Sequence, residues 1–180
     1  MSDRFNKLIP FILKAEGGFV NDPDDPGGAT KMGVSLRLLK SLGDIKWDLD
    51  HDGDIDIDDI RALTPELAKE IYWERFYAPL QLDAIRDEKL ALQVLDHAVN
   101  AGTRSAVKIL QHISGCKEDG LIGPKTIAAA NTFRDNIALR YQQGRYLFYE
   151  DLVEVKAKFA KYIPGWINRV KHIYETACQF

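Results

Sequence analysis

The sequence is poor in cysteine and has no long apolar run. Its 180 residues include two cysteines, Cys116 and Cys178. A domain stabilised by disulfides would need more of them, so we expect two free thiols. No apolar stretch reaches the roughly 18 residues that a membrane-spanning helix requires. The N-terminus also lacks the apolar stretch and cleavage site of a signal peptide, so we expect a protein made in the cytoplasm.

Strand patterns are also missing, because no segment of useful length alternates between apolar and polar residues. Apolar residues make up 46% of the chain, recur at helical spacing and suffice for a proper core. We therefore expect a mainly α fold, with turns or a short hairpin in residues 19–33. Ser35 and Thr64-Pro65 mark helix starts, and Pro164-Gly165 is expected to separate the last two helices. The expected helices cover residues 3–17, 34–42, 64–76, 88–99, 103–113, 124–150, 152–162 and 166–177.

The charge is divided unevenly along the chain. Residues 1–99 carry 12 basic and 20 acidic side chains, whereas residues 100–180 carry 12 basic and 7 acidic ones. The helical pattern also breaks at Asn100-Ala101-Gly102. We therefore expect two domains, residues 1–100 and residues 101–180. The positive second half could face an anionic polymer, although a solvated surface explains its charge nearly as well.

The stretch AEGGFVNDPDDPGGAT, residues 15–30, places acidic side chains on a loop stiffened by proline and bent by glycine. Glu16 lies at the expected C-terminal end of a helix, where the helix dipole and nearby apolar groups raise the pKa of a carboxyl group. A glutamate that keeps its proton near neutral pH can act as a general acid. Thr30 could orient a water. Candidates for the second acidic group of a glycoside hydrolase are Asp22, Asp24 and Asp25. Ordinary surface turns explain the same residues without catalysis.

The segment ILKAEGGFVNDPDDPGGATKMGVS, residues 12–35, closely resembles the signature of glycoside hydrolase family 108. The segments LTPELAKEIYWERFY and VLDHAVNAG also look like later parts of this family, so the resemblance covers roughly residues 5–100. Family members are lysozyme-like N-acetylmuramidases of phages and bacteria, sometimes described as secretion activators. The resemblance implies a lysozyme-like helical fold with a short loop or hairpin at the active site, and it implies Glu16 as the catalytic acid.

The positions of Glu16, Asp25 and Thr30 loosely resemble the Glu-Asp-Thr triad of phage-type lysozymes, although the gap from Asp to Thr is one residue shorter. We therefore place Asp25 ahead of Asp22 as the second catalytic group. Three further residues are expected to bind substrate, and they are Asn21, Asp96 and Asn100. Asp96 and Asn100 share one helical face and could instead brace the junction between the two domains.

Residues 48–59, DLDHDGDIDIDD, carry seven acidic side chains and no basic one. Calcium is bound by a twelve-residue loop of this kind, with acidic ligands at set positions and glycine at the turn, here Gly53. The expected calcium-binding residues are Asp48, Asp50, Asp52, Asp54, Asp56 and Asp59. The aspartate at the last position resembles the calcium loops of dockerin modules. We expect a structural Ca²⁺ that stabilises this insertion, and no cofactor for catalysis. A solvated acidic loop is the alternative.

The segment ILQHISGCKEDGLIGPKTIAAA, residues 109–130, resembles small helical peptidoglycan-binding domains. Its Asp119-Gly120 pair predicts a turn, Gly123-Pro124 predicts a helix start, and Leu121 and Ile122 are expected in the core. Sugar contacts must come from other side chains. Possible stacking groups are Tyr141, Tyr146, Tyr149 and Trp166, although their helical spacing favours core packing for most of them.

These features together predict a peptidoglycan hydrolase, an N-acetylmuramidase that cleaves the β-1,4 bond between N-acetylmuramic acid and N-acetylglucosamine. The expected partner is bacterial peptidoglycan, with no nucleic acid, and we expect a monomer that acts at the cell wall or in the periplasm. Its export would follow holin-like release, as in a phage or prophage endolysin, or another route. Two alternatives remain open. One is an inactive protein that only binds peptidoglycan, and the other is a calcium-dependent adaptor, which a single dockerin-like loop supports weakly.

Overall fold

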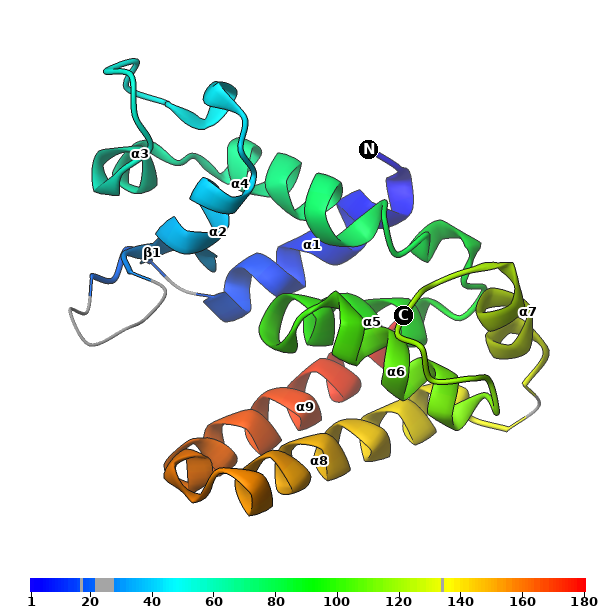
Figure 1. The fold of residues 1–180 in the computed structure, drawn as a ribbon. Coiled ribbons are helices and arrows are strands. Elements are labelled where there is room, and N and C mark those ends of the chain that lie inside the picture. The colour runs from blue at the N-terminus through cyan, green and yellow to red at the C-terminus, as the bar shows by residue number, and fades with distance from the viewer. Residues whose placement is uncertain (17, 22–27, 134) are drawn as a thin grey trace. The chain divides into compact units, whose positions relative to one another are not determined.

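The computed structural model describes residues 1–16, 18–21, 28–133 and 135–180, apart from the side chains of Ala15 and Glu16 (Figure 1). The chain is mainly helical, as predicted. It forms two compact units, one made of Met1 and Asn6–Trp73 and the other of Ser2–Phe5 and Glu74–Phe180. Among the described residues, no helix combines the length and the hydropathy needed to cross a membrane. The predicted boundary between residues 100 and 101 stays a prediction.

The elements follow one another with short connections. The first unit is built from α1 (Asp3–Glu16), β1 (Thr30–Lys31), β2 (Val34–Ser35), α2 (Leu36–Ser41), the 3-10 helix η1 (Ile45–Trp47), α3 (Ile57–Ala62) and α4 (Pro65–Tyr72). The chain continues through the π-helical turn η2 (Trp73–Tyr77), the 3-10 helix η3 (Leu82–Ala84), α5 (Glu88–Ala101), α6 (Thr103–Ile113), α7 (Pro124–Thr132), α8 (Ile137–Val155), the 3-10 helix η4 (Ala157–Tyr162) and α9 (Ile163–Ala177).

Two helix starts in the first unit are capped by the side chains that the sequence predicts. The Ser35 hydroxyl accepts a hydrogen bond from the Leu38 N–H at 3.2 Å, and the Thr64 hydroxyl accepts one from the Leu67 N–H at 3.3 Å. Pro65 occupies the first turn of α4, where its missing N–H would have no helical partner in any case. Local sequence therefore determines where α2 and α4 begin.

The expected short hairpin is present. Strands β1 and β2 pair antiparallel and are joined by Met32 and Gly33, whose φ angles of 50° and 75° are both positive. Such a pair of residues matches the right-handed twist of the strands. Val20 extends the ribbon, because its N–H donates to the Thr30 carbonyl at 2.8 Å and its carbonyl accepts from the Thr30 N–H at 2.7 Å. The Tyr72 hydroxyl donates to the Met32 carbonyl at 2.9 Å and ties the turn to α4.

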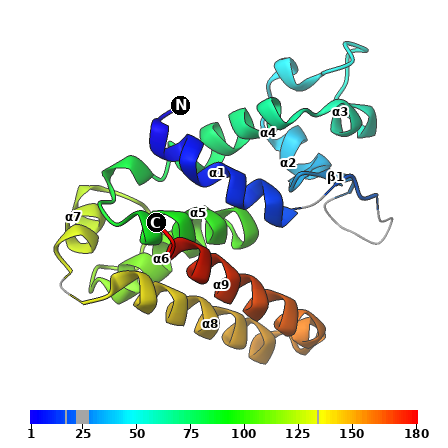
Figure 2. The same ribbon diagram turned by 180° about the vertical axis from the view of Figure 1, so that it is seen from behind.

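The second unit is a helical bundle around α5, which packs against α6, α8 and α9. Helices α8 and α9 run side by side, as the gold and red ribbons of Figure 2 show. Helices α6 and α8 come very close, since a Cβ added at Gly144 would lie 2.7 Å from the Ile109 Cγ2 atom. The apolar residues of α5 that lie wholly in the core are Leu90, Ala91, Leu92, Val94, Leu95 and Ala98.

The helices expected over residues 124–177 were wrong at three points. The separate helix expected over residues 152–162 does not form, because α8 continues to Val155 and residues 157–162 form the 3-10 helix η4. The single helix predicted over residues 124–150 is divided into α7 and α8, and Asn136 caps α8 by accepting from the Leu139 N–H at 3.0 Å. Pro164 and Gly165 do not separate two helices, because they lie in the first turn of α9. Proline is tolerated there since the first N–H groups of a helix lack internal partners. Pro164 therefore marks the start of α9.

Candidate functional site

The predicted catalytic acid stands at the end of α1, whose last residue is Glu16. The Glu16 side chain lies outside the described part of the chain, and so do Asp22 and Asp25. Their roles stay predictions. Asn21 is described and is exposed, directly after Val20, which pairs with the hairpin.

Thr30 is the predicted catalytic residue that the structure describes in full. It is half-buried in β1, with its backbone paired to Val20 on one side and to Ser35 on the other. Its hydroxyl donates to the Gly28 carbonyl at 3.3 Å. Because the donor is engaged, the lone pairs of the hydroxyl oxygen are what it can offer to a water.

The hairpin is fastened to α3 by side chains that no sequence motif identifies. The Lys31 ammonium donates to the Arg61 carbonyl at 2.5 Å, and the Arg61 guanidinium lies 5.5 Å from the centre of the Phe19 ring. Successive side chains of a strand alternate between its faces, so Lys31 points away from the face of Thr30. Arg61 is the penultimate residue of α3, whose first three residues are the last three of the acidic loop, so the hairpin and the loop adjoin in the first unit.

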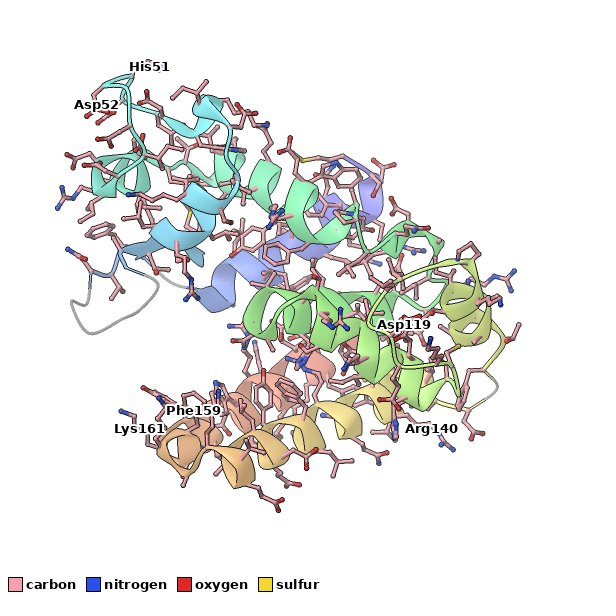
Figure 3. All side chains as sticks on the ribbon, in the orientation of Figure 1. His51, Asp52, Asp119, Arg140, Phe159 and Lys161 are labelled. Atoms are coloured by element: carbon pink, nitrogen blue, oxygen red, sulfur yellow. The ribbon has the colours of Figure 1, made fainter. Side chains whose placement is uncertain are left out.

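The acidic loop brings together four of the six predicted calcium ligands, in two groups that share Asp50, and it leaves out Asp54 and Asp59. Carboxylate oxygens of Asp48, Asp50 and Asp52 lie within 4.8 Å of one another. Asp48 is 5% exposed, and its carboxylate accepts from the backbone N–H groups of Asp52 at 3.2 Å and Gly53 at 3.0 Å. His51 and Gly53 bend the loop with φ angles of 63° and 104°. Figure 3 shows His51 and Asp52 at the outer end of the loop.

The end of the loop is tied back to its beginning. The carboxylate of Asp59, which is fully buried, accepts from the Leu49 N–H at 2.5 Å and from the Asp56 N–H at 2.6 Å. Oxygens of Asp50, Asp56 and Asp58 form a second group within 4.8 Å of one another. Desolvation and the Asp52 charge raise the pKa of Asp50. A set of carboxylate oxygens with no nitrogen or sulfur ligand is of the kind that Ca²⁺ prefers.

Asp96, predicted to contact substrate or to brace a junction, is fully buried in the second unit. It forms a short ion pair with Arg145 of α8. It also accepts from Arg169 of α9 through Nε at 3.0 Å and Nη2 at 2.7 Å. Burial alone would raise the pKa of Asp96, but the two guanidinium groups outweigh it and hold that pKa low. Asp96 therefore braces α5 against α8 and α9 and exposes no surface to a sugar. Asn100, one turn further along α5, is exposed.

His97 sits beside this ion pair in an aromatic cage. Its ring meets those of Phe148, Tyr149 and Tyr141 edge-on, with centroids 4.8, 5.7 and 6.4 Å away. Burial, and then the charge of Arg145, lower the pKa of His97 to about 3. The imidazole is therefore neutral at ordinary pH and serves packing.

The segment of residues 109–130, which resembles peptidoglycan-binding domains, is organised by Gln111, which is 2% exposed. Its amide nitrogen donates to the Asp119 carboxylate at 2.8 Å and to the Leu121 carbonyl at 3.0 Å. Its amide oxygen accepts from the Gly120 N–H at 2.8 Å. Gly120 has a φ of 74°, and an added Cβ would lie 2.6 Å from the Arg104 side chain, so only glycine fits.

The motif therefore shapes a turn, at the place where Figure 3 labels Asp119. Leu121, expected in the core, is 67% exposed, and that expectation was wrong, because Gln111 holds the Leu121 backbone while the side chain turns to solvent. A hollow of about 560 Å³ opens beside the turn, between Lys117 and Lys125. Of the four possible stacking groups, Tyr141 and Tyr149 are buried, which confirms the core-packing interpretation for these two.

Comparisons with known proteins agree with these features. The family model "Glycosyl hydrolase 108" matches residues 9–102, and the model "Predicted Peptidoglycan domain" matches residues 105–171. A solved structure titled "Structure of Brucella abortus SagA" is similar to the chain with a TM-score of 0.81 and 29% sequence identity, over 98% of this chain and 94% of that one. No curated protein matches the chain. The predicted lysozyme-like, mainly α fold and the resemblance of residues 12–35 are thereby confirmed. Since the first model covers more than half of the chain, the chain belongs to glycosyl hydrolase family 108.

Proposed function

We propose that this glycoside hydrolase is an N-acetylmuramidase that cleaves the β-1,4 bond between N-acetylmuramic acid and N-acetylglucosamine in bacterial peptidoglycan. The observation that carries the proposal is the arrangement of the first unit, where α1 ends at Glu16 and the hairpin with Thr30 follows. The C-terminal end of a helix disfavours a charged carboxylate. The end of α1 at this residue supports Glu16 as the group that keeps the proton that the reaction needs.

In this mechanism Glu16 donates its proton to the glycosidic oxygen as the bond to the anomeric carbon breaks. A second carboxylate stabilises the positive charge that develops on the sugar, or activates the water that attacks it. Asp25 is the first candidate for that role and Asp22 the second. The Thr30 hydroxyl, whose hydrogen is directed at the Gly28 carbonyl, accepts a hydrogen bond from the water and orients it.

The test is Glu16→Gln, which keeps the size of the side chain but removes its proton donor. We expect the release of reducing ends from purified sacculi to fall by about 100-fold or more. Glu66→Gln is the matched control, because Glu66 is an exposed glutamate of the first unit. Mass analysis of the released muropeptides identifies the bond, since a muramidase leaves N-acetylmuramic acid at the new reducing end. Undiminished release by Glu16→Gln would refute the assignment, and binding without release by the wild type would indicate an inactive wall-binding protein.

We also propose that the acidic loop binds one Ca²⁺ ion with a structural role. The proposal is supported by the converging oxygens of Asp48, Asp50 and Asp52 and by the positive φ angle at Gly53. Titration calorimetry should show one site in the wild type. The double variant Asp50→Asn/Asp52→Asn should lose it, whereas Glu66→Gln should keep it. An adaptor role predicts in addition a protein that binds only when the loop is loaded with calcium.

A further inference from the structure

A cluster of lysines and aromatic rings occupies the end of the α8–α9 pair. We refer to residues 156–166 as the α8–α9 tip. The tip carries three exposed lysines, which are Lys156, Lys158 and Lys161. The aromatic side chains of Phe159 and Tyr162 lie among them. Figure 3 shows Phe159 and Lys161 together at this end of the two helices. The tip lies within the residues matched by the peptidoglycan domain.

The three lysines lie over the rings. The Lys161 ammonium is 4.9 Å from the centre of the Tyr162 ring, and those of Lys158 and Lys156 are 5.4 and 5.8 Å from the centre of the Phe159 ring. Such contacts are weak at exposed sites, so an anion can draw the ammonium group away and uncover the ring.

The exposed ring of Tyr162 is held in place by contacts with more deeply buried rings. Tyr162 packs on Trp166, with centroids 5.7 Å apart, and Trp166 stacks on Tyr149 at 4.8 Å with an angle of 22° between the planes. Tyr149 is 3% exposed and belongs to the core, whereas Tyr162 is 47% exposed. The stack thus presents a ring at the surface in a fixed orientation, which lowers the entropic cost of binding.

The charge of this region has one sign. Residues 155–174 contain five lysine or arginine residues and no acidic one. The acidic residues that precede the region, Glu150, Asp151 and Glu154, lie on α8. Within the described part of the chain, the contacts of the three tip lysines are with rings, and none is an ion pair. Their charge is therefore available to an anionic partner.

We propose that the α8–α9 tip is the surface with which the second unit holds peptidoglycan, an inference that rests on the proposed substrate. The lysines pair with carboxylates of the stem peptides, and the uncovered rings pack against the apolar faces of the sugars. An anionic membrane would also attract lysines. The tip rings are held by contacts with one another and with Trp166, at centroid distances of 5.7 to 6.3 Å, and Phe159 is only half-exposed, so they are poorly placed to leave the protein surface and insert into a bilayer.

The first experiment removes the charge of the tip. The triple variant Lys156→Gln/Lys158→Gln/Lys161→Gln is compared with Lys108→Gln/Lys117→Gln/Lys125→Gln, which removes three exposed lysines elsewhere in the second unit. Both carry Glu16→Gln, so that the wall is not digested. We expect the tip variant to bind purified sacculi about tenfold more weakly at low salt and to lose most of the salt dependence of binding. The control should change less than about twofold. Equal losses would overturn the proposal and point to the hollow between Lys117 and Lys125.

The second experiment separates carboxylates from sugars. Tyr162→Leu removes the planar ring and should weaken binding both to intact sacculi and to oligomers of N-acetylglucosamine, which carry no carboxylate. The tip lysine variant should weaken binding to intact sacculi alone. Loss of binding to phosphatidylglycerol vesicles with unchanged binding to sacculi would identify a membrane surface and overturn the proposal. Hydrolysis is read separately, because a wild type that releases no muropeptides refutes the proposed activity and leaves the binding result standing.

Discussion

The acidic loop of the first unit and the α5–α8–α9 bundle of the second both contain carboxylate charge that needs compensation, but they compensate it in opposite ways. The loop holds seven acidic side chains in residues 48–59 and no lysine or arginine. Its carboxylates accept hydrogen bonds from backbone N–H groups. The bundle buries one carboxylate, that of Asp96, between the guanidinium groups of Arg145 and Arg169. The loop carboxylates lie close together in the chain, and we propose a Ca²⁺ ion as their counter-charge, whereas Asp96 is compensated by residues 49 and 73 positions away.

The largest effect is expected at the buried site. Asp96→Ala leaves two guanidinium groups without their carboxylate, one of them wholly buried, and should lower the free energy of unfolding by about 3–5 kcal/mol. Urea unfolding followed by circular dichroism measures it. A loss below about 1 kcal/mol would show that solvent or a rearranged partner readily replaces the carboxylate, and the contrast with the loop would then disappear.

Calcium should have the next largest effect, and we expect it to act on the acidic loop. At a concentration of 100 times its dissociation constant, Ca²⁺ should raise the free energy of unfolding of the first unit by about 2.7 kcal/mol, because it binds the folded loop. Thermal unfolding with Ca²⁺ and with a chelator measures the shift. Asp50→Asn/Asp52→Asn should abolish it, while Asp96→Ala should leave it unchanged. A shift that survives in the loop variant would place the ion elsewhere.

Acid should weaken the second unit through His97. Its folded pKa is about 3, lowered by burial and then by Arg145, whereas the unfolded chain has an ordinary histidine pKa near 6.5. Below that value the unfolded chain binds a proton that the folded chain refuses. The free energy of unfolding should therefore fall by up to about 1.4 kcal/mol per pH unit between pH 6 and pH 4 and be constant for this group above pH 7.

Urea unfolding at several pH values tests this slope. His97→Leu removes the titrating group while keeping an apolar side chain in the aromatic cage, so it should flatten the slope in this range. An unchanged slope in this variant would assign the acid sensitivity to other groups.

The smallest effect is expected at an exposed pair of the same unit. Lys171 and Glu175 of α9 lie 3.8 Å apart, and both side chains are more than half exposed. Glu175→Gln should change the free energy of unfolding by about 0.3 kcal/mol, because solvent screens the pair. A change above about 1 kcal/mol would mean that burial is not what distinguishes the Asp96 cluster from surface pairs.

Much of the fold could be predicted because its signals are local. Ser35 and Thr64 mark helix starts through contacts three residues along the chain, and the turn at Met32-Gly33 lies within the predicted hairpin region. The expectations that failed needed information from packing. Pro164 can end one helix or begin another, and only the position of α9 on the bundle selects the second use.

The candidate sites also differ in whether their residues lie close together in the sequence. The spacing of aspartates in residues 48–59 correctly brings Asp48, Asp50 and Asp52 together, because they lie on one short loop, but it also names Asp54 and Asp59, which are in neither group of converging oxygens, and it misses Asp58. For Asp96 the sequence left open a contact with substrate or a bracing role. No local pattern identifies Arg145 and Arg169 as its partners. The same holds for the stack of Tyr162, Trp166 and Tyr149, whose members lie on three different elements.

By itself, the sequence determined the family, the mainly helical fold, the hairpin after Glu16 and the acidic loop, since each depends on residues close together in the chain. Only the tertiary structure decided that Asp96 is a brace, that Leu121 faces solvent and that lysines and rings meet at the α8–α9 tip. The physical reason is that burial and long-range ion pairs are properties of packed helices. Which side chains meet depends on how α5, α8 and α9 pack together, and no local spacing in the sequence encodes that packing.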